Sequence, residues 1–484
     1  MNTGNKNGRT GRTPNRSKGP RGGSPGTGGV RPAHAGLRDK SPGEKPRKSG
    51  LLARQLAARV LGKVMSTGAH LDETVEAALN RKGVVLEPRD RAFVRLLVAT
   101  VLRHRGELDA VIRGFMVKPL PQRSGPMAEI LLLAAAQLLI LGTPAHAAIG
   151  LAVEAAKADR DARHFAGLAN AVLRRVASEG CSRRAALGET ACLNVPTNLL
   201  TRWTRTYGAE TAHRIARASL TEPALDLTVA SDADGWAERL HAVTLPTGTL
   251  RLDVTGRIED LPGYEQGAWW VQDAAAALPA RLLGDVDGRD IADLCAAPGG
   301  KTAQLAARGA RVTAVDISEP RLALLKSNLQ RLRIEAECVV ADIETWKPGR
   351  RYDGVLLDAP CSATGTIRRH PEILFSSRDQ EIERMAALQA RLMRNAADLV
   401  KPGGCLVYCT CSLEPEESEM QIETFLAERS DFSRQPVTVP EIGGIANAVS
   451  PVGDLRTLPH LSFEASARMA GMDGFFAARL RRRT

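Results

Sequence analysis

The second half of the chain alternates between strand-like and helix-like segments, a pattern that few folds accommodate. Apolar runs of strand length begin at five positions, namely Asp290, Arg311, Cys338, Gly354 and Cys405. Amphipathic helical patterns lie between them, most clearly over residues 319–332 and 380–400. This order is typical of an open, mostly parallel sheet covered by helices, in which ligands bind at the carboxyl ends of the strands. We therefore predict an α/β domain over residues 266–484.

A glycine-rich turn follows the first of these strands, within Asp293-Leu-Cys-Ala-Ala-Pro-Gly-Gly-Lys-Thr302, and a helical pattern continues from Ala303. Backbone N–H groups at the start of a helix point into such a turn, although an isolated Gly-Gly pair is more often an ordinary tight connection. The interpretation changes because Asp316, Asp342 and Asp358 each end one of the next three strands. We predict a nucleoside cofactor site in which Asp316 accepts from ribose hydroxyls, Asp342 pairs with the adenine edge and Asp358 faces the turn.

The turn also resembles part of a phosphate-binding loop, an alternative that the spacing disfavours. Gly300-Lys-Thr302 matches the end of that loop, and Val355-Leu-Leu-Asp358 mimics the strand that binds magnesium. The loop requires a glycine five positions before Gly300, however, and Cys295 occupies that position. An ATPase would also have no use for Asp316.

Two cysteines lie where the predicted chemistry would need them. Cys361 follows the fourth strand and Cys411 follows the fifth, so adjacent parallel strands would bring both to one cleft. A thiolate beside a nucleoside cofactor suggests nucleophilic catalysis. The alternative is a pair of buried, inert thiols, which is how we interpret the three cysteines Cys295, Cys338 and Cys405. Cys409 would share a face with Cys411 in an extended strand, so it stays a possible second nucleophile.

The first half of the chain is helical from Leu51 to about Gly180, which predicts an all-α domain over residues 51–185. Its longest apolar run, Ile130–Leu141, is too short to span a bilayer and predicts a buried helix. Residues 190–265 are less regular and predict a small α+β linker domain. Its expected strands are residues 225–229 and 243–252, its expected helices are residues 199–207 and 209–218, and Trp269 is expected to open a further helix.

The formal charge of +12 is concentrated at the N-terminus. Residues 1–50 hold twelve Lys and Arg against Asp39 and Glu44, a formal charge of +10, and almost no large apolar side chains. Such a segment cannot offset the entropy of ordering, so we expect it to be disordered. It is either a basic arm attracted to phosphates or a solubilising extension.

The eight cysteines indicate a reducing compartment. They are scattered over 484 residues without a Cys-x-x-Cys pair, and the close group Cys405, Cys409 and Cys411 lies in an apolar strand pattern that suits a metal poorly. The N-terminus lacks the apolar core of a signal peptide. We therefore expect a cytoplasmic protein with reduced thiols, and neither a metal nor a membrane as partner.

Several motifs together resemble the Sun/Fmu-type RNA cytosine-5 methyltransferases. They are Asp293–Thr302, Asp358-Ala-Pro-Cys-Ser-Ala-Thr-Gly365, Arg368-Arg-His-Pro-Glu372, Thr410-Cys-Ser412 and the closing strand Gly474-Phe-Phe-Ala-Ala-Arg-Leu480. The helical segment is similar to NusB-like RNA-binding domains through Asp90-Arg-Ala-Phe-Val-Arg95, Gln137-Leu-Leu and Asn170-Ala-Val-Leu-Arg174. The resemblance covers about residues 51–482. Cys409 departs from it, because the family usually has a small residue without a thiol there.

The resemblance implies a Rossmann-like S-adenosylmethionine methyltransferase domain that methylates cytosine through a covalent cysteine adduct. It assigns the attacking thiolate to Cys411 and the thiol that assists release to Cys361. The cofactor contacts that we expect are Cys295, Ala296, Ala297, Pro298, Gly299, Gly300, Lys301, Asp316, Asp342 and Asp358. Asp358 is a further candidate for the cytosine edge.

The expected partner is an accessible segment of RNA, because the target base must leave its stack to reach the cleft. The resemblance favours ribosomal RNA, and we expect a monomer. Two alternatives stay open: transfer RNA as the substrate, and a non-catalytic RNA-binding factor on a methyltransferase fold. The intact Cys361 and Cys411 speak against the second.

Overall fold

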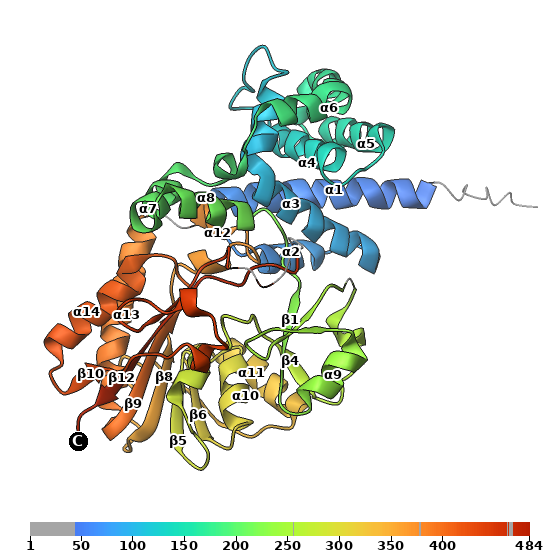
Figure 1. Cartoon of the computed structure of the whole chain (residues 1–484). Coiled ribbons are helices and arrows are strands. Elements are labelled where there is room, and N and C mark those ends of the chain that lie inside the picture. The colour runs from blue at the N-terminus through green and yellow to red at the C-terminus, as the bar shows by residue number, and fades with distance from the viewer. Residues whose placement is uncertain (1–43, 255, 377–378, 462, 464–467) are drawn as a thin grey trace, which may run out of the picture. The chain divides into compact units, whose positions relative to one another are not determined.

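The computed structural model describes residues 44–254, 256–376, 379–461, 463 and 468–484 (Figure 1). The chain divides into two units, residues 1–44 and 45–484. The basic segment 1–43 lies outside the described residues, and so does its expected disorder. Helix α1 starts at Glu44 rather than at Leu51, so the expected end of the tail at residue 50 is too late. Extending a helix by a few residues costs little once its first turns have formed.

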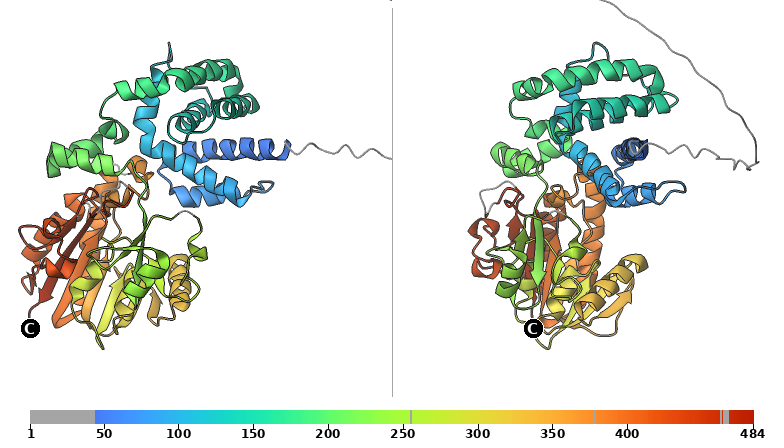
Figure 2. Two further views of the ribbon diagram at one scale, coloured as in Figure 1. Left: turned by 45° about the vertical axis from the view of Figure 1, so that its right-hand side comes forward. Right: turned by 90° about the vertical axis from the view of Figure 1, so that its right-hand side faces the viewer.

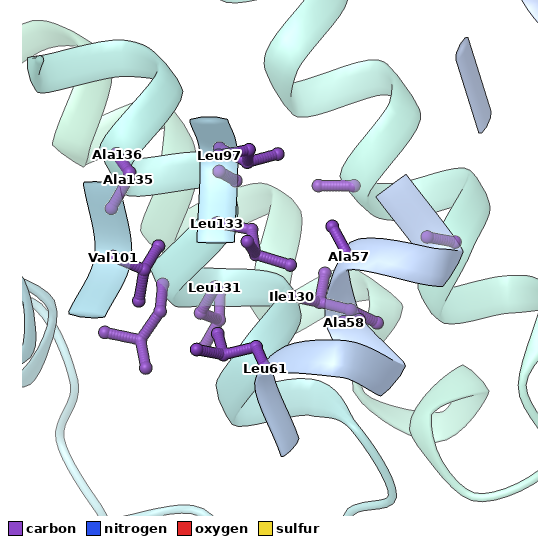
Figure 3. Packing of buried hydrophobic residues seen from close by; sticks show 14 of the residues in the cluster. Ala57, Ala58, Leu61, Leu97, Val101, Ile130, Leu131, Leu133, Ala135 and Ala136 are labelled. Atoms are coloured by element: carbon purple, nitrogen blue, oxygen red, sulfur yellow. The ribbon is translucent and has the colours of Figure 1, made fainter. Parts of the chain in front are cut away.

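Six α-helices form most of residues 44–186. They are α1 (Glu44–Thr67), α2 (Leu71–Leu79), α3 (Pro88–Arg113), α4 (Met127–Leu139), α5 (Ala145–Ala158) and α6 (Ala166–Ala186), with the short η1 (Ala162–Phe165) before α6. Figure 3 shows Leu61 of α1, Leu97 of α3 and Leu133 of α4 in the core that these helices share. The apolar run that predicted a buried helix is α4, in which Ile130 to Gln137 are all buried. No helix among the described residues is long and apolar enough to cross a membrane.

The segment that follows combines helices with a small antiparallel sheet. Its elements are η2 (Ala191–Asn194), α7 (Thr197–Tyr207), α8 (Ala209–Ala218), β1 (Leu225–Val229), α9 (Ala233–Leu240), β2 (Val243–Thr244), β3 (Leu250–Leu252), η3 (Ile258–Asp260) and β4 (Trp269–Val271). The sheet order is β2-β3-β1-β4. The helices predicted over residues 199–207 and 209–218 and the strand predicted over residues 225–229 are therefore present. The strand expected over residues 243–252 is instead two short strands, β2 and β3, which pair antiparallel across a turn.

The helix expected to begin at Trp269 is wrong. Residues 269–271 form strand β4, which pairs antiparallel with β1. The tryptophans decide this, because Trp269 is buried among the small-sheet residues and Trp270 is buried in the cluster beside α11 (Glu319–Leu332). Successive residues of a strand point to opposite faces, so only an extended backbone sends the two rings into different cores.

The larger sheet has eight strands, five of them parallel (Figure 2). Its order is β10-β12-β9-β8-β5-β6-β7, with β11 on β12. The strands are β5 (Asp290–Leu294), β6 (Arg311–Asp316), β7 (Glu337–Val340), β8 (Tyr352–Asp358), β9 (Val400–Thr410), β10 (Phe432–Arg434), β11 (Leu455–Thr457) and β12 (Phe475–Arg482). The parallel group confirms the predicted α/β fold, and β12 returns antiparallel to β9.

Helices cover both faces of this sheet. They are α10 (Gly300–Ala306), α11, α13 (Asp379–Asp398) and α14 (Glu419–Glu428). The short α12 (Ile373–Ser376) packs instead in the core with α7 and α8. Short 3-10 turns lie at η4 (Pro279–Leu283), η5 (Thr364–Thr366), η6 (Pro415–Glu417), η7 (Pro440–Ile442) and η8 (Ala446–Ala448). The neighbours Ala314 and Val315 of β6 show the two sides. Ala314 belongs to the core with α11, and Val315 to the core with α13 and α14.

Candidate active site

The glycine-rich turn leaves β5 and enters α10 through a backbone that depends on one glycine. Gly299 has φ 104°, a value that side chains disfavour, and an added Cβ would lie 2.8 Å from Cγ of Leu325. Cys295 is also left-handed, with φ 60°. The turn is therefore held tightly against α11.

Hydrogen bonds inside the protein occupy part of the turn that was predicted to contact a cofactor. The Ala296 N–H donates to Val315 O at 3.0 Å, and the Gly299 N–H donates to Ala296 O at 2.9 Å. The Ala297 N–H donates to Oδ2 of Asp316 at 3.1 Å. Three of the predicted contact residues thus use their N–H groups to shape the turn.

Asp316 ends β6, as the sequence predicted. The neighbouring strand β7 ends at Val340, opposite Asp316, so Asp342 lies two residues beyond the strand rather than at its end. Asp316 is buried, and its Oδ1 accepts from the Ser318 N–H at 2.9 Å while its Oδ2 accepts from Ala297. Asp342 is exposed, and its Oδ1 accepts from the Glu344 N–H at 2.9 Å. Both carboxylates keep further acceptor capacity, since an ionised carboxylate has about four acceptor sites.

Asp358 joins the turn to the thiol region through Lys301. The Lys301 ammonium lies 2.7 Å from Asp358 Oδ2 and 5.0 Å from the centre of the Phe475 ring. Burial opposes the charged form of Lys301, but the Asp358 carboxylate outweighs it and raises the pKa of the ammonium. Lys301 is therefore held as a cation beside the end of β8.

Cys409 lies within strand β9, buried beneath the end of β8. It is opposite Asp358 in the β8–β9 register, is fully buried, and its thiol donates to Asp358 Oδ1 at 3.4 Å. Burial, reinforced by Asp358, raises the pKa of Cys409 well above its ordinary value. The Cys409 thiol is therefore protonated at neutral pH, and its proton is donated to Asp358 in a hydrogen bond.

The structure brings Cys361 and Cys411 together, as neighbouring parallel strands predicted. Their sulfur atoms lie 3.5 Å apart, and the Gly365 N–H donates to Cys411 O at 2.9 Å. The two loop backbones approach so closely that a Cβ on Gly365 would lie 2.8 Å from Cys411 O, and it would lie 1.9 Å from O of Gly474, just before β12. The hydrogen bond to Cys411, with burial, raises the pKa of Cys361 well above its ordinary value.

The remaining predicted spectator thiols differ in burial. Cys405 is buried, whereas Cys295 and Cys338 are only partly buried. Burial raises the pKa of all three, that of Cys405 to about 11. Among the residues that the structure describes, no group of three or more His, Cys, Asp or Glu side chains could hold a metal ion.

A cavity of about 600 Å³ opens at Cys361. Its walls come from the loop after β8, the connection between α1 and α2, α12 and the start of α13. A volume of this size accommodates a nucleobase, because ligand pockets usually measure about 300–1,000 Å³.

Two buried acids of the site, Asp293 and Glu417, were not predicted from the sequence. Asp293 of β5 accepts from Thr302 Oγ1 at 2.6 Å, and burial raises its pKa to about 7. Glu417 is fully buried behind the two thiols, where it contacts Ser362 and Ser412. Glu417 ends Glu414-Pro-Glu-Glu, which has the composition of an exposed acidic turn, so nothing in the sequence indicates that Glu417 is buried.

Comparison with protein families gives two matches. Residues 280–481 match the family described as 16S rRNA methyltransferase RsmB/F, and residues 51–178 match the NusB family. The match limits support the predicted N-terminal and C-terminal domains, while the domain boundaries themselves stay predictions.

Similar whole proteins and structures extend the likeness over most of the chain. The ribosomal RNA small subunit methyltransferase B of Xanthomonas campestris pv. campestris is 36% identical over 405 residues, 80% of this chain and 91% of the relative. Its counterpart in Serratia proteamaculans is 37% identical, covering 79% and 92%. The fold is similar to the crystal structure of PH0851, with a TM-score of 0.68 at 23% identity over 89% of this chain and 98% of that one. NSun6 from Pyrococcus horikoshii, solved with SFG, has a TM-score of 0.51 at 20% identity, covering 60% and 98%.

The family models and the relatives point to the same family that the cysteine motifs and the glycine-rich turn resemble. The chain belongs to the family of the bacterial ribosomal RNA small subunit methyltransferases B, with a NusB-like domain before a Rossmann-like methyltransferase domain.

Proposed function

We propose that the chain transfers a methyl group from S-adenosylmethionine to carbon 5 of a cytosine in small-subunit ribosomal RNA, through a covalent adduct of Cys411. The observation that carries this proposal is the 3.5 Å separation of the Cys361 and Cys411 sulfur atoms beyond the ends of β8 and β9. A nucleophile with a second thiol beside it is the arrangement that addition to the base and later release both require. The named relatives support ribosomal RNA as the substrate.

The residues beside the thiols fit S-adenosylmethionine, which supplies an electrophilic sulfonium methyl group when it is bound. Asp316 can accept from the ribose hydroxyls, since each of its oxygens accepts one backbone N–H and has capacity for another hydrogen bond. Asp342 offers an exposed carboxylate two residues beyond the end of the neighbouring strand β7. The close packing of Gly299 on Leu325 keeps the turn between these acids and the thiols in one conformation.

Cys411 makes carbon 5 reactive. Its thiolate adds to carbon 6 of cytosine, which forms a sulfur–carbon bond and moves an electron pair toward carbon 5, so that the ring becomes an enamine. Carbon 5 then forms a bond to the methyl group, and the methyl–sulfonium bond breaks. Loss of the carbon 5 proton restores the ring double bond and expels the Cys411 sulfur.

Cys361 assists at the same sulfur. Its raised pKa keeps it as a thiol at neutral pH, so it can donate a hydrogen bond to Cys411 Sγ. A hydrogen bond to a developing thiolate stabilises it, both before attack and as the sulfur leaves carbon 6. We therefore assign the nucleophile to Cys411 and assistance in release to Cys361, in agreement with the family resemblance.

Methylation of purified small-subunit ribosomal RNA tests the proposal. The protein, methyl-labelled S-adenosylmethionine and the RNA should yield label at one or a few cytosines, which bisulfite sequencing would locate. A parallel reaction with purified transfer RNA tests the alternative substrate. Label in transfer RNA and none in ribosomal RNA would show that transfer RNA is the substrate. Calorimetry that detects RNA binding but no S-adenosylmethionine binding would favour the non-catalytic RNA-binding factor instead.

A further inference from the structure

One buried acid lies behind both thiols and has no role in the chemistry described so far. Glu417 ends η6 and is fully buried, and burial raises its pKa while hydrogen bonds from Ser362, Ser412 and Gln389 oppose that rise. An apolar residue would cost less in such a place, because burying a carboxylate is unfavourable unless its partners compensate. Its partners therefore indicate what it does.

The partners of Glu417 are the residues that directly follow the two thiols. Oε1 accepts from the Ser362 N–H at 2.8 Å, and Oε2 accepts from Ser362 Oγ and from Ser412 Oγ, both at 2.5 Å. Ser362 follows Cys361, and Ser412 follows Cys411. One carboxylate thus holds two loops that are 50 residues apart in the chain.

Other contacts fix Glu417 itself. Gln389 of α13 donates from Nε2 to its Oε1 at 3.3 Å, and its main-chain carbonyl accepts from the Tyr408 hydroxyl at 2.7 Å. Tyr408 lies in β9, the strand that leads to Cys411. The carboxylate is therefore anchored to the sheet and to the covering helix before it meets the two serines.

We propose that Glu417 is a positioning residue that sets the separation and direction of the Cys361 and Cys411 thiols. It acts through Ser362 and Ser412 and does not touch the substrate. The inference rests on the proposed function only in taking these two thiols as the reacting pair. A change in either loop of a few tenths of an ångström would alter both the thiol–thiol hydrogen bond and the approach of Cys411 to carbon 6.

Two measurements on the full chain test this role. The first is steady-state methylation, which separates kcat from KM for RNA. The second is bridging of the two thiols by dibromobimane, which becomes strongly fluorescent after it has alkylated two nearby thiols and needs neither RNA nor cofactor. Cys361→Ala removes one of the two thiols, so the fluorescence that it loses relative to wild type is the signal from bridging of Cys361 and Cys411.

Glu417→Ala should lower kcat by about 100-fold, the scale for a misplaced reacting group, while KM for RNA changes less than about twofold. Bridging should slow in parallel. Glu417→Gln keeps the shape and one acceptor oxygen, so it should recover part of both signals. Glu423→Gln removes an exposed carboxylate of α14 and serves as the matched control.

The variants Ser362→Ala and Ser412→Ala each remove one hydroxyl that donates to Glu417. These smaller changes keep the test valid if Glu417→Ala does not fold. Each should slow bridging, by less than Glu417→Ala does. Wild-type kcat and wild-type bridging in folded Glu417→Gln and in both serine variants would overturn the proposal. Bridging that depends on Glu417 in a protein that methylates no RNA would instead overturn the proposed function and leave the positioning role intact.

Discussion

The two sides of the site are built differently. The side that we propose for the cofactor, called the cofactor side below, is mostly one continuous segment, the turn after β5, held by Asp316 at the end of β6. The thiol side combines two loops, after β8 and after β9, with the carboxylate of Glu417 between them. Lys301 and Asp358 connect the two sides through an ion pair of 2.7 Å.

This difference determines how each side should respond to substitution. Loss of a contact on the cofactor side should weaken binding and leave the thiol pair in place, because the turn is shaped by neighbours close to it in the sheet. Loss of a contact on the thiol side should reduce the rate of chemistry and leave cofactor affinity unchanged. Independent responses would support the division, and coupled responses through Lys301 and Asp358 would contradict it.

The largest effect is expected from Cys411→Ala. Without the nucleophile, neither methyl transfer nor a covalent RNA complex should form, and S-adenosylmethionine affinity should stay unchanged.

The Cys361→Ala enzyme should still attack and methylate the RNA but release it slowly, so protein covalently bound to RNA should accumulate on denaturing gels. Cys338→Ala, which changes a partly buried thiol of β7, is the control. A covalent complex that survives in Cys411→Ala would show that Cys411 is not the nucleophile. A complex that disappears only in Cys361→Ala would show that the two thiols have exchanged roles.

Asp316→Ala should act on the cofactor side alone. The loss of acceptors for ribose hydroxyls should cost about 1–3 kcal/mol of S-adenosylmethionine binding, the scale of a hydrogen bond to a charged group. Calorimetry would measure the affinity, with circular dichroism as the check on folding. Thiol bridging should keep its wild-type rate. Wild-type cofactor affinity in the folded variant would remove Asp316 from the binding site.

Asp293→Asn should change how stability depends on pH. Burial raises the pKa of Asp293 to about 7, above its unfolded value of about 3.9. The folded state therefore binds more protons between these values, and the contribution of Asp293 to stability is present below about pH 4 and lost as pH rises through 7.

Asn does not ionise, so the free energy of unfolding of Asp293→Asn should improve relative to wild type by about 1–3 kcal/mol between pH 5 and pH 8. Urea unfolding at the two pH values measures the difference. Asp454 and Asp473, whose pKa values burial raises to about 6, contribute equally in both proteins. A difference that does not change with pH would show that Asp293 does not titrate in this range.

Cys409→Ser should have the smallest effect. A serine hydroxyl can replace the buried thiol as a donor to Asp358 Oδ1, so activity and the covalent complex should stay close to wild type. The measurement compares kcat and the amount of complex with those of the wild-type protein. A large loss of the complex would make Cys409 a second nucleophile and would contradict its burial behind the site.

Short-range patterns in the sequence determined most of the fold. The predicted bounds of β1, α8 and α11 agree with the structure, because amphipathic spacing and residues that stop a helix or strand act within a few positions. The order of strands and helices likewise predicted that Asp316 and Asp358 end parallel strands, whereas Asp342 lies two residues beyond the end of β7. The meeting of Cys361 and Cys411 followed from the same order.

Only the tertiary structure decided the features that depend on distant neighbours. Trp269 and Trp270 lie in a strand because two separate cores receive their rings. Asp293 and Glu417 look like ordinary acids in the sequence, yet segments far along the chain enclose them and change their pKa values. A pattern records which side chains are apolar, whereas the burial of a charge depends on hydrogen-bond donors that the complete fold brings to it.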